Sequence, residues 1–393
     1  MSCKWTAKAA YLVIMLGPAC FASGAAKPAP AVVQAPVEAR VPFSPTLVTG
    51  TDGQQHLAYE IHITNFYGDT GPLTALDLDV KADGSDASLA HWSANDIAGV
   101  ARPEPKEGQP LRIEPGKQAT IYVFLNPRAG VQPRVLRHTM HFDMGGKTAL
   151  LDGVKVDVSS TPAIRLGPPL KGGRWVAHEG PGNAHSHHWG SIVVANGDMT
   201  IPQRYALDLV GVDAHGHAMR DNVKDFSHTT HADWLGYGAE VLAVADGVVT
   251  ASRNSEPDNA PLQPQPEPSS LTLDGLFGNY VVLQVAPGTW AGYAHLKPGS
   301  VLVKPGDHVK RGQVIARLGQ SGNSAAPHLH FQLANRPIFE GSEGVPFVFD
   351  TFRYEGTETE AQIFGQGDPW KPTDGSIRHD QMPLSDTVLN FSP

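Results

Sequence analysis

Apolar and polar residues alternate in short runs along the first half of the chain. The clearest of these runs lie at residues 57–65, 76–80, 111–113, 119–125, 135–142 and 153–158. A period of two is typical of strands that bury one face. Turn sequences such as Glu114-Pro115-Gly116 separate the runs, and no helical periodicity accompanies them. The pattern predicts an immunoglobulin-like β-sandwich over residues 46–162.

Short apolar runs and turns also fill the second half, which follows a Pro- and Gly-rich linker at residues 162–173. The 41 glycines and 33 prolines of the chain favour short strands over helices. We therefore expect an all-β protein whose second domain covers residues 174–351. Residues 253–278 are rich in proline and predict a surface loop, and residues 352–393 read as a polar tail with one strand at 387–391.

The N-terminus has a basic start, an apolar run at residues 9–22 and small residues at 23–26. This pattern predicts a secretory signal peptide over residues 1–26, followed by a Pro/Ala-rich lead over 27–45, and hence a periplasmic or secreted protein. Cys3 and Cys20 both lie in the signal, so the mature chain would have neither a disulfide nor a thiolate metal site.

A net charge of −9 without a long basic run argues against nucleic acid as a partner. No second apolar stretch reaches membrane-spanning length, so we expect no membrane span in the mature chain. The oligomeric state cannot be predicted from these features.

Three histidines stand out in the second domain. His328 and His330 are separated by one residue ahead of a strand-like run, and His295 ends another apolar run. Residues at i and i+2 of a strand share a face, which suits one imidazole as a metal ligand and the other as an acid or base beside it. The alternative is that His328 and His330 are surface polar residues of an edge strand, but His295 at the end of an apolar run weighs against it.

These histidines belong to a larger set of motifs. In order, the chain reads Tyr237-Gly238-Ala239-Glu240, Gly278-Asn279-Tyr280, Tyr293-Ala294-His295-Leu296, Pro305-Gly306-Asp307 and His328-Leu329-His330-Phe331. With this order and spacing, the region resembles the lysostaphin/LytM-type zinc endopeptidases of peptidase family M23. It is similar to a proteobacterial two-domain variant in which a His-containing segment precedes a Gln-Arg-aromatic-Ala-x-Asp strand, here residues 203–208.

The resemblance implies a LytM-like antiparallel sheet and zinc-dependent hydrolysis of the peptide cross-links of bacterial peptidoglycan. In that family, zinc is held by the His and Asp of a His-x-x-x-Asp motif and by the second His of His-x-His. Carried over to this chain, Asp208 and His330 are metal ligands, and His295 and His328 are the catalytic pair.

The chain departs from the family at one ligand, because Arg204 occupies the place of the first His and a guanidinium cannot bind a metal. The sequence His217 to Asp221 has the literal spacing but lies in a polar loop. We predict that His188, or failing that His187, supplies the missing imidazole. A turn at Asn196-Gly197-Asp198 would fold residues 191–195 back on 201–209 and return the histidine cluster towards Asp208.

Other sources of the third ligand stay open, namely His185, His228 and His231. Arg204 itself is expected to pair with Asp208, to bind a substrate carboxylate or to form a structural salt bridge. Two other functions compete with the enzyme. One is an inactive LytM-like domain that binds the cell wall or activates a separate hydrolase. The other is a lipoyl-like export adaptor, which lacks the helical-hairpin heptads that it would need.

Overall fold

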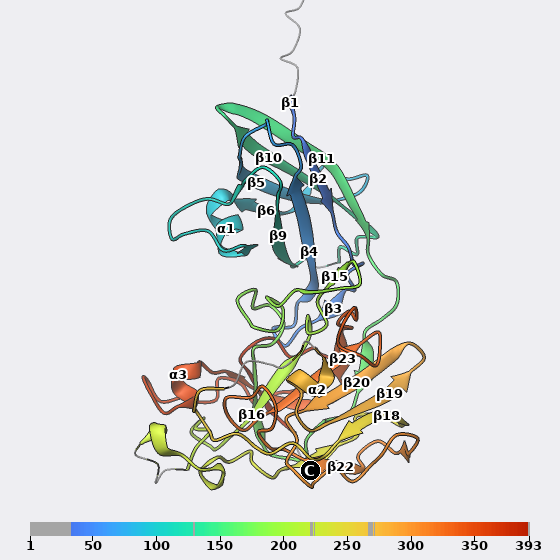
Figure 1. The fold of residues 1–393 in the computed structure, drawn as a ribbon, viewed down its shortest axis with the longest axis vertical. Coiled ribbons are helices and arrows are strands. Elements are labelled where there is room, and N and C mark those ends of the chain that lie inside the picture. The colour runs from blue at the N-terminus through green and yellow to red at the C-terminus, as the bar shows by residue number, and fades with distance from the viewer. Residues whose placement is uncertain are drawn as a thin grey trace, which may run out of the picture.

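The computed structural model describes residues 33–391, except residues 129, 221–222, 224, 266–269 and 271. The predicted signal peptide and both cysteines lie outside the described residues. Two regions are stacked along the long axis of the molecule, and both consist almost entirely of β-strands (Figure 1). The all-β prediction is therefore confirmed. Among the described residues, no helix has the length and apolar character needed to cross a membrane.

The first region contains two sheets that enclose one hydrophobic core. One sheet has the order β1-β11-β10-β5-β6, with β8 on β5, and the other has the order β2-β4-β9-β7, with β3 on β4. The strands are β1 (Val33–Gln34), β2 (Val37–Arg40), β3 (Val48–Thr49), β4 (Gln55–Asn65), β5 (Leu73–Ala82), β6 (Ser88–Ser93), β7 (Ala101–Arg102), β8 (Arg112–Ile113), β9 (Lys117–Leu125), β10 (Val135–Met144) and β11 (Lys147–Asp157).

Every alternating run of the first half forms a strand of these sheets. The immunoglobulin-like topology stays a prediction. Strands β1 and β2 form in the segment that was expected to be a Pro/Ala-rich lead. They form there because their backbones pair with β11 and β4. A short helix, α1 (Ala94–Gly99), was not predicted. It begins at Ser93, whose side chain and backbone exchange hydrogen bonds with Asp96 in a capping box.

The second region is organised around a ten-stranded antiparallel sheet of order β21-β18-β19-β20-β23-β16-β13-β27-β25-β26. Two-stranded sheets β12-β24, β14-β15 and β17-β22 accompany it. The strands are β12 (Ile164–Leu166), β13 (Arg174–His178), β14 (Val193–Ala195), β15 (Asp198–Thr200), β16 (Leu207–Val212), β17 (Glu240–Leu242), β18 (Gly247–Arg253), β19 (Tyr280–Ala286), β20 (Thr289–Ala294), β21 (His308–Val309), β22 (Val314–Arg317), β23 (Leu329–Ala334), β24 (Phe347–Phe349), β25 (Phe352–Thr357), β26 (Ile377–Arg378) and β27 (Thr387–Asn390).

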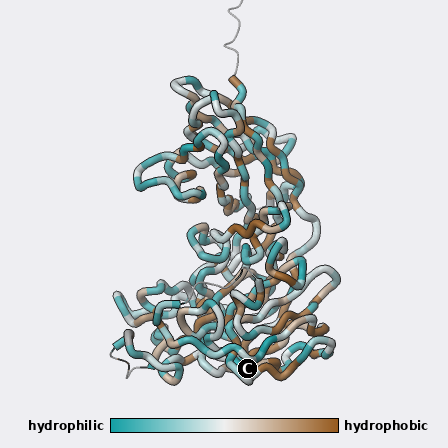
Figure 2. Tube along the Cα trace, in the orientation of Figure 1, coloured by the Kyte–Doolittle hydropathy of each residue, from teal (hydrophilic) through white to brown (hydrophobic). Residues whose placement is uncertain are grey.

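Among its described residues, the second region also contains four short helical segments. They are η1 (Phe226–His228), η2 (His231–Asp233), α2 (Leu273–Leu276) and α3 (Glu360–Ile363). Helix α2 lies within the Pro-rich segment that was expected to have no regular structure. Hydrophobic stretches run through the strands of both regions and hydrophilic stretches through many of the connecting loops (Figure 2).

Three boundaries drawn from composition differ from the structure. The expected tail joins the main sheet, since β27 pairs with both β13 and β25. The expected linker is docked, because its buried apolar side chains, Leu166 and Leu170, pack in the core of the second region. The expected hairpin is shorter than predicted: β14 pairs with β15, and β16 pairs instead with β13 and β23.

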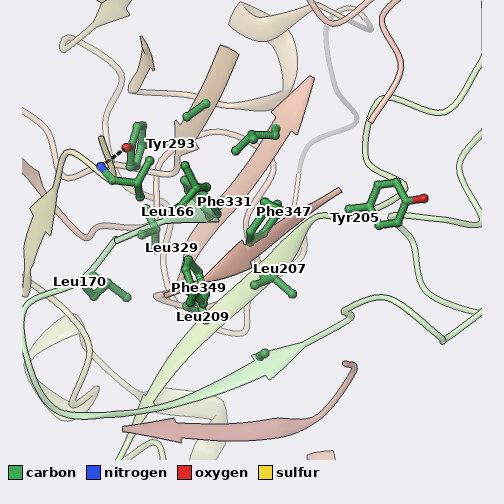
Figure 3. Packing of buried hydrophobic residues seen from close by; sticks show 14 of the residues in the cluster. Leu166, Leu170, Tyr205, Leu207, Leu209, Tyr293, Leu329, Phe331, Phe347 and Phe349 are labelled. Carbon is green, nitrogen blue, oxygen red and sulfur yellow. Dashed lines mark hydrogen bonds between the residues drawn. The ribbon is translucent and has the colours of Figure 1, made fainter. Parts of the chain in front are cut away.

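Alternation in β16 and β23 decides which side chains face the core. Leu207 and Leu209 are buried with Phe331, Phe347 and Phe349 (Figure 3). The rings of Phe331 and Phe347 lie edge to face, with their centroids 5.2 Å apart. Because successive strand residues point to opposite faces, the residues between these apolar positions emerge together on the other side of the sheet.

Candidate metal centre and active site

Asp208 and His330 come from neighbouring strands and lie directly opposite each other. They are register partners in the antiparallel pair β16–β23, so their side chains share the face opposite the core. Nδ1 of His330 lies 3.1 Å from Oδ1 of Asp208. Both side chains are buried. The sheet therefore places two of the expected ligands together.

His188 reaches the same point from the irregular segment between β13 and β14. Its buried ring places Nε2 3.3 Å from Oδ1 of Asp208 and 3.1 Å from Nδ1 of His330. Its Nδ1 lies 3.0 Å from the carbonyl oxygen of Glu179, which can only accept a hydrogen bond. Nδ1 therefore carries the proton and Nε2 presents a lone pair. Burial lowers the pKa of His188 to about 4, so the ring is neutral at neutral pH.

Gln332 fixes the tautomer of His330 in the same way. Nε2 of His330 donates to Oε1 of Gln332 at 2.9 Å, which leaves the lone pair of Nδ1 directed at Asp208 and His188. Gln332 stands two residues after His330 and shares its face of β23. Hydrogen bonds of this kind orient metal-ligating imidazoles and select the nitrogen that binds.

The converging atoms fit a zinc ion. Burial alone would raise the pKa of Asp208, but His328 and His188 beside it bring the pKa well below its usual value. The carboxylate is then ionised, and three lone-pair atoms meet at separations of 3.1, 3.1 and 3.3 Å. Ligands at the usual Zn–N and Zn–O distances in a tetrahedral site lie about 3.3–3.4 Å apart. Two imidazoles and one carboxylate also leave the fourth position open.

His295 and His328 lie beside these three residues. Nδ1 of His328 donates to the carbonyl of Ala326 at 2.8 Å, and Nδ1 of His295 donates to the carbonyl of Ser321 at 2.8 Å. Their ring centroids are 4.7 Å apart, and Nε2 of His328 lies 3.3 Å from Oδ1 of Asp208. With Nδ1 engaged by a carbonyl, each ring has Nε2 as its remaining nitrogen.

The backbone of His295 is unusual for a residue with a β-carbon. Its φ of 59° lies in the left-handed region, which costs energy for any residue other than glycine. Two hydrogen bonds hold it there, from its own N–H to the carbonyl of Phe277 and from the N–H of Gly319 to its carbonyl. The strained backbone is thus held by the C-terminal end of α2 and by the loop that follows β22.

His187 gives Asp208 a further imidazole. Its Nε2 lies 3.5 Å from Oδ2 of Asp208 and its Nδ1 lies 3.5 Å from Oε2 of Glu179. His187, His188 and Asp208 also offer three donor atoms within 4.8 Å of one another. The side chain of His187 is 63% exposed, whereas that of His330 is 2% exposed and lies closer to both partners. We therefore prefer His330 as the third member of the ligand set.

The remaining candidate histidines have other surroundings. His228 pairs with Asp225 at 2.7 Å, and Nε2 of His231 lies 2.8 Å from the carbonyl oxygen of Asn259. His185 is exposed, and its backbone N–H donates to Asn183. The prediction that His187 or His188 lies close to Asp208 is confirmed as a matter of geometry.

Arg204 points away from these histidines. Its guanidinium is buried and pairs with Glu60 and Glu343 at 2.7 Å each. Of the three expectations for Arg204, the structural salt bridge is correct, and pairing with Asp208 is wrong. No local sequence pattern pointed to Glu60 as a partner, because Glu60 precedes Arg204 by 144 residues.

Two clefts meet at the histidines. The first, the α3 cleft, has a volume of about 440 Å³, and its apolar wall consists of Trp234, Leu262, Ile363 and Phe364. The second, the β14 cleft, has a volume of about 450 Å³, and it is walled by Ser191, Val193, Phe277 and Phe339. His187 and Asn323 line both clefts. Together the clefts offer space for an extended chain on both sides of Asp208 and His330.

Comparison with known proteins identifies the central part of this region. Residues 233–339 match the sequence model of peptidase family M23. These residues form an M23 domain. It contains His295, His328 and His330, whereas His188 and Asp208 precede it and α3 follows it.

Two curated relatives come from Vibrio cholerae. The peptidoglycan DD-endopeptidase ShyA is 33% identical over 175 residues, which cover 42% of this chain and 35% of ShyA. The peptidoglycan DD-endopeptidase ShyB is 44% identical over 63 residues, which cover 16% of this chain and 14% of ShyB. The chain thus spans about a third or less of the length of each relative.

Among solved structures, the catalytic domain of lysostaphin from Staphylococcus simulans resembles the chain at 22% identity. The match covers 42% of this chain and 79% of that domain, with a TM-score of 0.22.

Sequence reasoning missed the residues that orient the M23 domain's histidines and their partners. Gln332 was detectable in principle, because a polar residue at i+2 of a candidate ligand on a strand shares its face. The carbonyls of Glu179, Ser321 and Ala326 had no sequence signal, since any residue carries a carbonyl.

Proposed function

We propose that this protein is a zinc-dependent endopeptidase that hydrolyses peptide cross-links of bacterial peptidoglycan. The observation that carries the proposal is the convergence of three lone-pair atoms from His188, Asp208 and His330 beside two further imidazoles at the junction of two clefts. The M23 domain and the activity named for ShyA and ShyB support peptide cross-links of the cell wall as the substrate.

In this proposal, His188, Asp208 and His330 would hold the zinc ion. A zinc ion held there would supply Lewis acidity toward the scissile carbonyl and toward a water molecule. Glu179 and Gln332 keep the ligand lone pairs aimed at one point by accepting the opposite ring protons.

His295 and His328 move protons in the proposed reaction. Each is held by a hydrogen bond from Nδ1 to a backbone carbonyl, so each can accept a proton only at Nε2. One ring would take the proton of the attacking water and deliver it to the leaving amine, while the other, protonated at Nε2 by solvent, would donate to the developing oxyanion. The α3 and β14 clefts would hold the peptide on either side of the scissile bond.

The location of the protein is also part of the proposal. The basic, apolar and small-residue pattern of residues 1–26 is typical of a secretory signal peptide, and peptidoglycan lies outside the inner membrane. We therefore place the mature protein in the periplasm or outside the cell.

Four alanine variants separate ligands from catalytic residues. His188→Ala and His330→Ala should lose zinc, measured by elemental analysis of the purified protein. His295→Ala and His328→Ala should retain most of the zinc and lose roughly 10²–10⁴-fold in the rate of cleavage of purified peptidoglycan. His308→Ala is the control, because it removes an exposed imidazole on edge strand β21.

The results have clear alternatives. Full zinc occupancy in His188→Ala would remove it from the ligand set. A zinc-loaded wild type without cleavage of any peptidoglycan would favour the binding or activating role over the enzyme.

A further inference from the structure

The segment that carries His188 packs against the first region of the molecule. It lies between β13 and β14 and is formed by turns rather than strands. Most of the internal hydrogen bonds of this segment are short-range, such as the N–H of Gly190 to the carbonyl of Ser186 at 2.8 Å. Such bonds shape a loop but do not fix its position relative to the sheet. Its position therefore depends on contacts outside the segment.

Strands β4 and β9 provide many of those contacts. Trp189, the neighbour of His188, is buried with its ring edge-on to Tyr122 and Phe124, at centroid distances of 5.6 and 6.1 Å. The hydroxyl of Tyr122 donates to the carbonyl of Gly190 at 3.4 Å. Pro181 makes one contact on the other side, where its carbonyl accepts from the N–H of Ser385.

Arg102 of β7 adds a hydrogen bond to the start of the segment. Its Nη2 donates to the carbonyl of Ala184 at 2.9 Å. Three strands of one sheet, β4, β7 and β9, thus contact the segment between residues 182 and 190.

Glu60 of β4 is the polar centre of this interface. It is 1% exposed, and its carboxylate accepts from the indole N–H of Trp189 and from both Nε and Nη2 of Arg204, at 2.8 and 2.7 Å for the arginine. Trp189 follows His188, and Arg204 precedes Asp208 by four residues. One buried side chain of the first region therefore contacts the segments that carry two of the three proposed ligands.

The position of Glu60 follows from the alternation in β4. Tyr59 and Ile61 point into the core of the first region, whereas Ala58 and Glu60 point to the second region. An ionised side chain is stable in such a place only when its lone pairs are used. Three N–H donors use them here.

We propose that Glu60 is a positioning residue for the metal centre, which makes the N-terminal sheet a structural part of that centre. It acts through Trp189 and Arg204. These two residues hold the His188 segment and the start of β16 in the relative positions that bring His188 Nε2 to Asp208. The inference rests on the proposed zinc site, but its central contacts belong to the protein without metal.

Glu60→Gln tests the proposal with almost no change of shape. An amide offers one acceptor oxygen, and its NH₂ group would face N–H donors of Arg204 or Trp189. Trp189→Phe is a second variant, which keeps an aromatic ring but removes the indole N–H together with part of the buried ring system. Tyr59→Phe is the matched control: it removes a buried hydroxyl from the adjacent residue of β4, whose hydrogen bond of 2.9 Å goes to His138 inside the first region.

Two measurements on the full chain separate positioning from general stability. The first is hydrogen exchange in metal-free protein at the amides of Ser186, Trp189 and Gly190, which should become about tenfold faster in Glu60→Gln and Trp189→Phe. The second is zinc affinity by competition with a chelator, where the dissociation constant should rise about tenfold or more. In Tyr59→Phe both should match the wild type.

Each outcome decides a different question. Wild-type exchange at these amides in both test variants would overturn the proposal, as would equal loosening in Tyr59→Phe. Faster exchange with unchanged zinc affinity would mean that Glu60 stabilises the interface without positioning the ligand, and would also overturn it. If the wild type binds no zinc, the proposed function fails, whereas the exchange result still shows whether Glu60 holds the segment.

Discussion

Arg204→His is the substitution that family resemblance alone would recommend, because it restores the His-x-x-x-Asp spacing. The structure leads to the opposite expectation. The side chain at position 204 points to Glu60 and Glu343, while His188 already faces Asp208. We expect Arg204→His to destabilise the protein and not to tighten zinc binding.

The size of the loss follows from burial. Arg204 and Glu60 are each 1% exposed. The carboxylates of Glu60 and Glu343 offset the free-energy cost of burying the charge of Arg204. Removing one member of a buried ion pair costs about 3–5 kcal/mol, because the partner charge is left without compensation. Two carboxylates lose their partner here, although Glu60 keeps the indole N–H of Trp189. We therefore expect a loss near the upper end of that range.

Equilibrium unfolding in urea measures the stability change, and chelator competition measures zinc affinity. Arg137→His is the control, because Arg137 forms an exposed pair with Asp152, and such pairs contribute about 0–1 kcal/mol. The double variant His188→Ala with Arg204→His tests whether a histidine at position 204 can supply the ligand that position 188 has lost. We expect this variant to bind no zinc. Recovery of zinc in that double variant, or a stable Arg204→His protein with tighter zinc binding, would refute the assignment of His188.

Two further substitutions test local features. Burial lowers the pKa of His138 to about 4, against about 6.5 in an unfolded chain. The contribution of the neutral ring to stability is therefore intact above pH 6.5 and decreases as the pH falls towards 4, by about 3 kcal/mol in total. Urea unfolding at pH 7 and pH 4.5 should therefore show a smaller acid loss in His138→Gln than in the wild type, and equal losses would contradict this cause. In Gly319→Ala, the new Cβ would lie 2.4 Å from backbone atoms of Lys297, beside His295, so we expect a loss of about 1–3 kcal/mol and slower cleavage of peptidoglycan. Gly375→Ala meets nothing within 4 Å and should behave as the wild type in both assays.

Local sequence patterns predicted part of the candidate site. The pair His328 and His330 was visible because a strand has a period of two, whereas Asp208 was assigned only through the resemblance to the family's motif. The same alternation predicted β4, in which Tyr59 and Ile61 face one core. It did not show that the other face of β4 is also buried, since a covered face depends on a second region of the chain.

The errors share one physical cause. Polar composition suggested a free tail after residue 351, yet β25 and β27 complete the main sheet through backbone hydrogen bonds, which any side chain permits. The Pro- and Gly-rich linker is likewise docked, since β12 pairs with β24 and Leu166 and Leu170 are buried in the core. Composition describes average exposure, whereas pairing and docking depend on a few positions.

The proposed centre is assembled from more of the chain than the M23 domain. Residues 233–339 contain His330 but neither Asp208 nor His188. The strand of Asp208, β16, lies between β23 and β13, and β13 in turn pairs with β27 from the C-terminal segment. The ring of His188 is held by a segment that packs on β4 and β9. Because ligand atoms must meet within a few tenths of an ångström to bind a metal, the proposed centre would depend on the N-terminal sheet and the C-terminal strands as well as on the M23 domain.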